Sequence, residues 1–309
     1  MPADPRIYVA GARTLIGSAI LRRLIEQHVP NIVSEDEPDL TDRVAVERFV
    51  DRMRPDWIFV AAGKSAGIAG NQQSPADLML DNLLAGTHLV SSAWKSGAGK
   101  LLYLASSCIY PKLAPQPFSA ASLWTGPVEP TSDAYAVAKL AGVKLCEAYR
   151  RQHGANFITA IAADVYGPGD DFSVEQSHVA AALVRRIHEA KTTDAPVVEI
   201  WGSGTPRREF IYVDDLADAS IFTMQRYDGS EPLNLGTGVS TSIAELADTI
   251  RSVVGYRGEL RFDRSKPDGM PFKGLDPEPL KKMGWKPRYT LRQGLEETYQ
   301  AFTRSLPPM

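Results

Sequence analysis

The sequence predicts an α/β fold with a doubly wound parallel sheet and a smaller C-terminal α/β region. Two observations support this prediction. Short apolar runs alternate with amphipathic stretches through the first half of the chain, as in parallel sheets with helical crossovers. After about residue 166 this alternation gives way to Gly/Pro-rich loops around short elements, which is typical of a region that shapes a pocket.

The first half contains the expected elements in a regular order. Strand IYVA precedes a helix over about 17–27, and strand NIVS precedes a helix over 44–53. Strand WIFVAAG, a helix over about 76–95 and strand LLYLA follow, and the helix containing YAVAK leads to strand FITAIAA. A helix between each pair of strands is typical of parallel pairing, with both faces of the sheet covered.

A glycine-containing loop joins the first strand to the first helix. Gly11 follows the strand and Gly17 opens the helix, so backbone N–H groups at the helix start are free to bind a pyrophosphate. The pattern is similar to the GxxGxxG of short-chain dehydrogenases, with Thr14 in place of the middle glycine. It indicates a Rossmann-like dinucleotide site, although a plain strand-to-helix turn is the other interpretation.

The domain boundary is expected where the rhythm of elements changes. Residues 1–165 are predicted to form the dinucleotide-binding domain, and residues 166–309 to form mainly a substrate-binding region. The loops YGPGDDF, WGSGTPRREF and KPDGMPFKGLD belong to this second region. Some elements over about 200–240 are expected to return to the main domain.

Tyr135 and Lys139 are the first candidates for chemistry. Their spacing of four places them on one helix face, where the lysine ammonium is expected to lower the tyrosine pKa and make Tyr135 a general acid. Ser106 follows strand LLYLA, so a substrate carbonyl fits between Ser106 and Tyr135. A tyrosine four residues before a lysine also occurs by chance, so the pair needs its context.

Composition excludes several other classes of function. A formal charge of −3 with interspersed acids and bases gives no basic patch for nucleic acid or an acidic membrane. The N-terminus lacks a basic stretch followed by an apolar segment, and no apolar run approaches membrane-spanning length, so a cytoplasmic protein is expected. Cys108 and Cys146 have no metal-ligand spacing and are too few for a disulfide scaffold, so no metal is predicted.

Seven motifs occur in one order along nearly the whole chain. They are GARTLIG, SSCIYPK, EPTSDAYAVAKLAG, DVYGPGDDF followed by SHV, WGSGTPRREFIYVDD, LNLGTG and SKPDGMP. Together they resemble the GDP-L-fucose synthase family of the extended short-chain dehydrogenase/reductase superfamily. The resemblance implies a homodimeric enzyme that epimerises C3 and C5 of a GDP-4-keto-6-deoxyhexose and reduces C4 with NADPH.

The resemblance also assigns catalytic roles. Cys108 and His178 match the residues that remove and return the C3 and C5 protons, which the C4 ketone acidifies. Tyr135 would protonate O4, Ser106 would bond that oxygen, and Lys139 would hold the cofactor ribose. The other interpretation of Cys108 is a small apolar filler, and Cys146 is expected in the core.

Binding residues follow from the same motifs. The predicted cofactor contacts are Gly11, Arg13, Thr14, Leu15, Ile16, Gly17, Ala61, Tyr135 and Lys139. The predicted nucleotide-sugar contacts are Ser107, Arg186, Trp201, Arg208 and Lys273.

Several positions depart from the family pattern. Phe272 stands where the family has an arginine, and Asp164 replaces an asparagine. A second arginine for an adenosine 2′-phosphate is missing, so Arg13 is the only clear clamp, while Glu35 and Asp36 favour a free ribose 2′-hydroxyl. NADP(H) is the favoured cofactor and NAD(H) is possible.

Two other functions stay open at the level of sequence. One is a relative that acts as epimerase or 4-ketoreductase on a different 4-keto nucleotide sugar. The other is a catalytically silent NAD(P)-binding sensor, which would need the glycine loop and not the proton donors. The sequence leaves open the nucleotide, the sugar, and whether C3, C5 or both invert.

Overall fold

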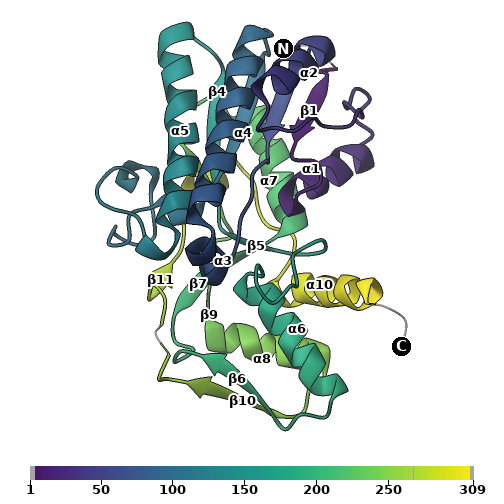
Figure 1. The fold of residues 1–309 in the computed structure, drawn as a ribbon, viewed down its shortest axis with the longest axis vertical. Helices are drawn as coiled ribbons and strands as arrows, with labels where there is room; N and C mark the ends of the chain where they lie inside the picture. The colour runs from purple at the N-terminus through teal and green to yellow at the C-terminus, as the bar shows by residue number, and fades with distance from the viewer. Residues whose placement is uncertain (1–3, 267, 307–309) are drawn as a thin grey trace.

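The fold was described from a computed structural model that covers residues 4–266 and 268–306. Pro267, within the predicted loop KPDGMPFKGLD, lies outside the described residues, as do the first three residues of the N-terminus. Figure 1 shows an upper part built on one large sheet and a lower part built from shorter strands and helices.

The main sheet has five parallel strands in the order β1-β2-β3-β4-β8. Their bounds are β1 (Ile7–Ala10), β2 (Trp57–Val60), β3 (Lys100–Ser106), β4 (Phe157–Ala162) and β8 (Leu233–Leu235). Strands β1, β3 and β4 are buried along almost their whole length, which explains why they read as continuous apolar runs. The predicted doubly wound parallel sheet is therefore confirmed.

The predicted strand NIVS is the exception. Only Ile32 forms a bridge, with Ile7, flanked by bonds from the Ile7 amide to Asn31 and from the Val33 amide to Ile7. Residues that are disfavoured in strands bound it on both sides: Pro30 precedes it and an acidic run ending at Pro38 follows. The pairing therefore ends after one bridge.

Helices cover both faces of the main sheet. α2 (Arg43–Met53), α4 (Pro75–Lys95) and α5 (Asp133–His153) form one layer, and α1 (Leu15–Glu26) packs with α7 (Val213–Arg226) in the other (Figure 1). The bounds of α1, α2 and α4 lie within two residues of the predicted ones at each end. Their apolar periodicity and caps, such as the Asp42 carboxylate on α2, mark these bounds.

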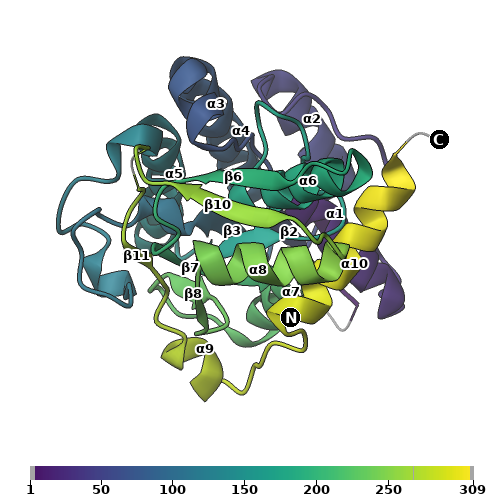
Figure 2. The same cartoon turned by 90° about the horizontal axis from the view of Figure 1, so that it is seen from below.

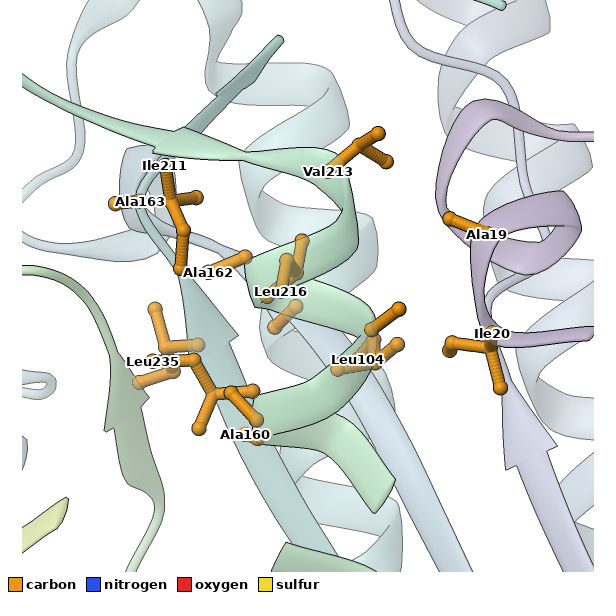
Figure 3. Close-up of a cluster of buried hydrophobic side chains, with 14 of the residues drawn as sticks. Ala19, Ile20, Leu104, Ala160, Ala162, Ala163, Ile211, Val213, Leu216 and Leu235 are labelled. Carbon is orange, nitrogen blue, oxygen red and sulfur yellow. The ribbon is translucent and has the colours of Figure 1, made fainter. Parts of the chain in front are cut away.

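The α7 layer packs through small and branched side chains. Figure 3 shows Leu216 of α7 among Ala160, Ala162 and Leu235 of the sheet, with Leu104 and Ile20 on the α1 side. All six side chains are almost fully buried. α7 and β8 thus bring part of the second half of the chain back to the main sheet.

The lower part contains two small sheets. β6 (Val197–Trp201) pairs with β10 (Glu259–Asp263), and Figure 2 shows these strands beside α6 (Val179–Thr192) and α8 (Ile243–Val254). The other sheet has the order β11-β7-β5, and β9 pairs antiparallel with β7. The bounds of its strands are β5 (Asp164–Tyr166), β7 (Arg207–Tyr212), β9 (Ser240–Ser242) and β11 (Phe272–Lys273).

Shorter elements complete the chain. They are α3 (Ile68–Gln73), α9 (Glu278–Lys282), α10 (Leu291–Ser305) and 3₁₀ turns over Ser107–Ile109, Ala120–Ser122 and Pro130–Ser132. The predicted loop WGSGTPRREF is shorter than expected, because its ends belong to β6 and β7. Within the described ranges, no helix has the length and apolar character that crossing a membrane requires. The predicted domain boundary near residue 165 stays a prediction.

Candidate active site

The glycine loop between β1 and α1 is closely packed against the end of β2. Gly11 has φ +83°, and a Cβ atom there would lie 2.6 Å from the Ala62 Cα. At Gly17 a Cβ would lie 2.0 Å from the Gly11 carbonyl oxygen, so both positions require glycine. The missing side chains let the loop backbone turn tightly at the start of α1.

Thr14 organises this loop in place of a glycine. Its Oγ1 accepts a bond from the Gly17 amide at 3.0 Å and lies 2.8 Å from the Gly11 carbonyl and 3.1 Å from the Ala61 carbonyl. Thr14 is the N-cap of α1, whose first-turn N–H groups are the ones that bind a pyrophosphate in such folds. The cradle and helix start therefore fit a dinucleotide, with Leu15 and Ile16 in the first turn.

An acidic segment lies beside the same loop. The Glu37 carboxylate accepts bonds from the Gly11 amide and the Tyr8 hydroxyl, each at 2.7 Å. Arg13, the predicted phosphate clamp, forms an exposed ion pair with Asp36 at 3.2 Å. Negative charge thus lies where the ribose of a dinucleotide is expected.

Tyr135 and Lys139 share one face of α5, as their spacing predicts. The Lys139 Nζ lies 6.0 Å from the centre of the Tyr135 ring and donates a bond to the Ala62 carbonyl oxygen at 3.0 Å. Burial lowers the pKa of Lys139 to about 8, against a weaker opposing effect of Cys108. Lys139 therefore connects α5 to the residue that packs on the glycine loop.

The predicted effect of Lys139 on Tyr135 is wrong. The pKa of Tyr135 is raised well above its ordinary value, first by burial and then by the neighbouring Cys108 and Tyr103. Desolvation disfavours the phenolate more than a lysine ammonium at this distance favours it. Tyr135 is thus a neutral phenol at physiological pH, the form in which it can donate a proton.

Ser106 and Cys108 lie two residues apart at the carboxyl end of β3. Ser106 ends the strand, and Cys108 lies half-buried in the 3₁₀ turn that follows. Burial raises the pKa of the Cys108 thiol, while the Lys273 ammonium, a bond to Ser106 and the Lys139 ammonium lower it. Cys146, by contrast, is fully buried in α5, as its predicted place in the core requires.

His178 stands at the N-cap position of α6 without a capping bond from its side chain. Its side chain is open to solvent, yet surrounding protein lowers its pKa by desolvation. Asp164 and Asp171 oppose this shift, and Lys273 adds to it. Because Asp164 and Lys273 shift the pKa of Cys108 as well, the same pair of charges acts on both candidate proton-transfer groups.

The predicted nucleotide-sugar residues fall into two groups. Lys273 and Ser107 lie beside Cys108, where the Asp164 Oδ1 accepts bonds from the Lys273 Nζ at 2.5 Å and from the Ser107 Oγ at 3.4 Å. Arg208 lies on β7 next to Lys273 and donates to the Met270 carbonyl at 2.5 Å.

The second group lies farther into the lower part. Arg186 donates from α6 to the Glu199 carbonyl oxygen of β6. Trp201, at the end of β6, is 72% exposed, and the Lys266 ammonium lies 5.6 Å from its ring centre. A flat exposed indole with a cation above it is suited to stacking on a base or a sugar. The contacts of Arg186 and Trp201 given above are with residues other than Ser107, Cys108, Asp164 and Lys273.

One polar residue beside this site was missed by the sequence reasoning. Asn82 is 2% exposed on α4 and donates to the Lys64 and Leu78 carbonyls, while its Oδ1 has no partner among the described residues. A Cβ at Gly63 would lie 2.1 Å from this oxygen and 3.2 Å from the Lys139 Nζ. The available signal was an asparagine on the buried face of an amphipathic helix.

Comparisons with known proteins agree with this geometry. Residues 7–236 match the model of the NAD dependent epimerase/dehydratase family. A probable GDP-L-fucose synthase 1 from Oryza sativa subsp. japonica is 49% identical and covers 97% of this chain and 93% of its own.

Solved structures are similar over nearly the whole length. A GDP-6-OMe-4-keto-L-xylo-heptose reductase from C. jejuni has a TM-score of 0.93 at 30% identity, covering 99% of both chains. A GDP-L-fucose synthetase from Naegleria fowleri bound to NADP has a TM-score of 0.90 at 26% identity, covering 98% of this chain and 95% of its own.

Proposed function

The chain belongs to the NAD-dependent epimerase/dehydratase family and, within it, to the GDP-L-fucose synthases, and from this premise we propose which reaction its site performs. The proposed reaction is epimerisation at C3 and C5 and reduction at C4 of GDP-4-keto-6-deoxymannose, giving GDP-L-fucose. Membership makes the protein an NAD(P)-dependent epimerase/reductase. The residue roles given below are part of the proposal.

One observation carries this function. Cys108 and His178 come from separate parts of the chain, and the charges of Asp164 and Lys273 act on both, while Ser106, Tyr135 and Lys139 lie on the β3 and α5 side. A plain ketoreductase needs a proton donor at the carbonyl oxygen only. Two further groups able to accept and return protons fit an enzyme that also inverts carbon centres.

The role proposed for each catalytic side chain follows from its protonation state. Cys108 removes a proton from carbon beside the ketone once its thiol is ionised, and His178 returns one from the opposite face. Tyr135, kept neutral by burial, protonates O4, and Ser106 donates a bond to the same oxygen. The nicotinamide supplies hydride to C4 when the dinucleotide is bound.

The proposed reductant is NADPH. A structural neighbour is bound to NADP, and Arg13 lies in the glycine loop where it can reach a 2′-phosphate after leaving Asp36. NADH is the alternative, because Glu35 and Asp36 place negative charge near the same position. A homodimeric assembly and a cytoplasmic location stay predictions of the sequence.

Turnover of a defined substrate tests the function. Purified protein is incubated with GDP-4-keto-6-deoxymannose and either NADPH or NADH, while oxidation of the dinucleotide and formation of GDP-L-fucose are followed. Production of GDP-L-fucose supports the proposal. Oxidation of the dinucleotide with formation of GDP-6-deoxymannose or its C4 epimer GDP-6-deoxytalose, the two possible products of reduction without epimerisation, would contradict it.

A reductase acting on another GDP-linked keto sugar is the second candidate. It is favoured by the likeness to the C. jejuni heptose reductase and by Phe272, an uncharged residue next to Lys273. No turnover of the deoxymannose derivative, together with turnover of a GDP-4-keto-heptose, would favour this candidate.

A further inference from the structure

We propose that Asp164 is a positioning residue for the epimerisation step, which holds the Lys273 ammonium beside Cys108 and balances its charge there. The inference rests on the proposed function for its catalytic meaning. The contacts on which it depends, those of Asp164 with Lys273 and Ser107, are formed between side chains of this protein alone. It assigns to Asp164 a role apart from contact with the substrate.

The small sheet brings the two residues together from distant parts of the chain. Asp164 begins β5 and pairs with Phe210 of β7, while Lys273 ends β11 and pairs with Arg208 of the same strand. Phe210 and Arg208 are two residues apart, so their side chains point to one face of the sheet. Lys273 therefore reaches across β7 to Asp164 on that face.

The contact is short and largely shielded. The Lys273 Nζ lies 2.5 Å from the Asp164 Oδ1, with the two side chains 17% and 25% exposed. The same oxygen accepts a bond from the Ser107 hydroxyl, next to Cys108 in the 3₁₀ turn. Asp164 thus links β11 to the turn that carries the thiol.

The two charges act on Cys108 in opposite directions. The Lys273 ammonium favours the thiolate, whereas the Asp164 carboxylate disfavours it. The other groups that face Cys108 are Ser106 of β3 and Lys139 and Tyr135 of α5. With its counter-charge in place, Lys273 favours the thiolate less than a free ammonium would.

His178 experiences the same pair with reversed preferences. The Asp164 carboxylate favours the imidazolium, and Lys273 disfavours it, with Asp171 as the other charged neighbour. A carboxylate at position 164 therefore favours a neutral thiol together with a protonated histidine. We infer that Asp164 makes ionisation of Cys108 depend on a higher pH than Lys273 alone would set.

The reactivity of Cys108 toward iodoacetamide measures this effect without substrate. Cys146 is fully buried, so alkylation of the folded protein reports on Cys108. Asp164→Asn removes the charge and keeps an oxygen that can accept bonds from both the Lys273 ammonium and the Ser107 hydroxyl, so Lys273 stays beside Cys108. The pH midpoint of alkylation is expected to fall by about one unit in this variant, because the Lys273 cation loses its counter-charge.

Two further variants complete the test. Lys273→Met is expected to raise the midpoint, and it tests the pair even if Asp164→Asn fails to fold. Asp171→Asn is the matched control, because its carboxylate faces His178 and its loss should leave the Cys108 midpoint in place. An unchanged or raised midpoint in folded Asp164→Asn, or an equal shift in Asp171→Asn, would overturn the inference.

Deuterium exchange then connects the pair to the reaction. In heavy water, the acid limb of exchange at C3 and C5 of the keto sugar is expected to move to lower pH in Asp164→Asn, while the equilibrium affinity for NADPH stays unchanged. An acid limb that stays in place would also contradict the inference. Absence of exchange in the unmodified protein would instead contradict the proposed function and leave the alkylation result to decide on Asp164.

Discussion

Lys139 is charged at neutral pH although 93% of its surface is removed from solvent. Its Nζ donates to the Ala62 carbonyl oxygen and lies 5.5 Å from the centre of the Tyr103 ring. Such a residue costs stability, because burial disfavours the charged form. We expect the site to retain it for the cofactor ribose that it is proposed to hold.

Replacement by methionine tests this cost. Lys139→Met is expected to be more stable than the unmodified protein at pH 7, by an amount on the order of 1–3 kcal/mol, since a pKa lowered from 10.5 to about 8 is a penalty on the charged form. The folded state binds fewer protons than the unfolded state between pH 8 and 10.5, so the advantage of the variant should shrink across that window.

Urea unfolding of both proteins at several pH values measures the difference. A variant less stable than the unmodified protein at pH 7 would show that the bond to Ala62 outweighs desolvation. A constant difference from pH 7 to 10.5 would show that Lys139 does not titrate there.

Tyr135 is expected to be needed for reduction and dispensable for epimerisation. Tyr135→Phe removes the proton donor to O4 and should slow reduction by about 10²–10⁴-fold, while deuterium still enters the keto sugar. The two rates are followed by dinucleotide absorbance and by NMR. Tyr149→Phe, near the C-terminal end of the same helix, serves as the control. Equal loss of both rates in Tyr135→Phe would rule out this division of work.

Cys108 is expected to show the opposite behaviour. Cys108→Ser should lose deuterium exchange while binding the dinucleotide normally, because a serine hydroxyl is a much weaker acid than a thiol and supplies no anion to accept the proton. Dinucleotide fluorescence measures the binding, and NMR measures the exchange. Unchanged exchange in this variant would remove Cys108 from the reaction.

At the level of elements, the Tyr135–Lys139 helix is held by close contact with β3. Gly142 lies one turn after Lys139 on α5, and a Cβ there would lie 2.2 Å from the Tyr103 Cζ. The helix therefore approaches the strand at a position where only glycine fits. This contact fixes the distance between the proposed proton donor and the strand that ends at Ser106.

Gly142→Ala separates packing from helix propensity. Propensity alone would stabilise the helix by up to about 1 kcal/mol, whereas the clash with a buried ring is expected to destabilise the protein by about 1–3 kcal/mol. Gly86→Ala on α4 is the matched control, since its Cβ would lie 3.3 Å from the same ring. Chemical unfolding in which Gly142→Ala is the more stable of the two variants would contradict the close packing.

The elements were predictable where one physical signal dominated. Strands such as LLYLA and FITAIAA are buried on both faces, so their apolar runs identified them. NIVS misled, because four uncharged residues do not reveal that the flanking proline and acidic run end the pairing after Ile32. The short strands that contain Arg207 and Phe272 were also missed. Pairing with the neighbouring strands determines whether such segments become strands, and their own composition does not reveal it.

The local geometry of the candidate site was predictable, and its electrostatics were less so. The glycine loop and the Tyr135–Lys139 spacing place those groups correctly, because local geometry determines them. The raised pKa of Tyr135, the unpartnered Asn82 oxygen and the Asp164–Lys273 pair depend on burial and on contacts between distant segments. No spacing along the chain encodes these properties.

At the scale of the whole molecule, the main sheet supplies one half of the proposed reaction and the lower part supplies the other. Ser106, Tyr135 and Lys139 belong to β3 and α5, whereas His178 stands at the N-cap position of α6 and Lys273 belongs to β11. Cys108 lies where the two groups meet, since it is faced by Lys139 and by Lys273. The proposed combination of epimerisation and reduction therefore draws on residues from both parts of the chain.

Isotope content of the product tests this two-stage reaction most directly. The unmodified protein is allowed to convert GDP-4-keto-6-deoxymannose with NADPH in heavy water, and the product is analysed by NMR at each carbon. We expect deuterium at both C3 and C5 of the reduced sugar. A sugar reduced at C4 that carries ordinary hydrogen at both positions would show that the protein is a ketoreductase without epimerase activity.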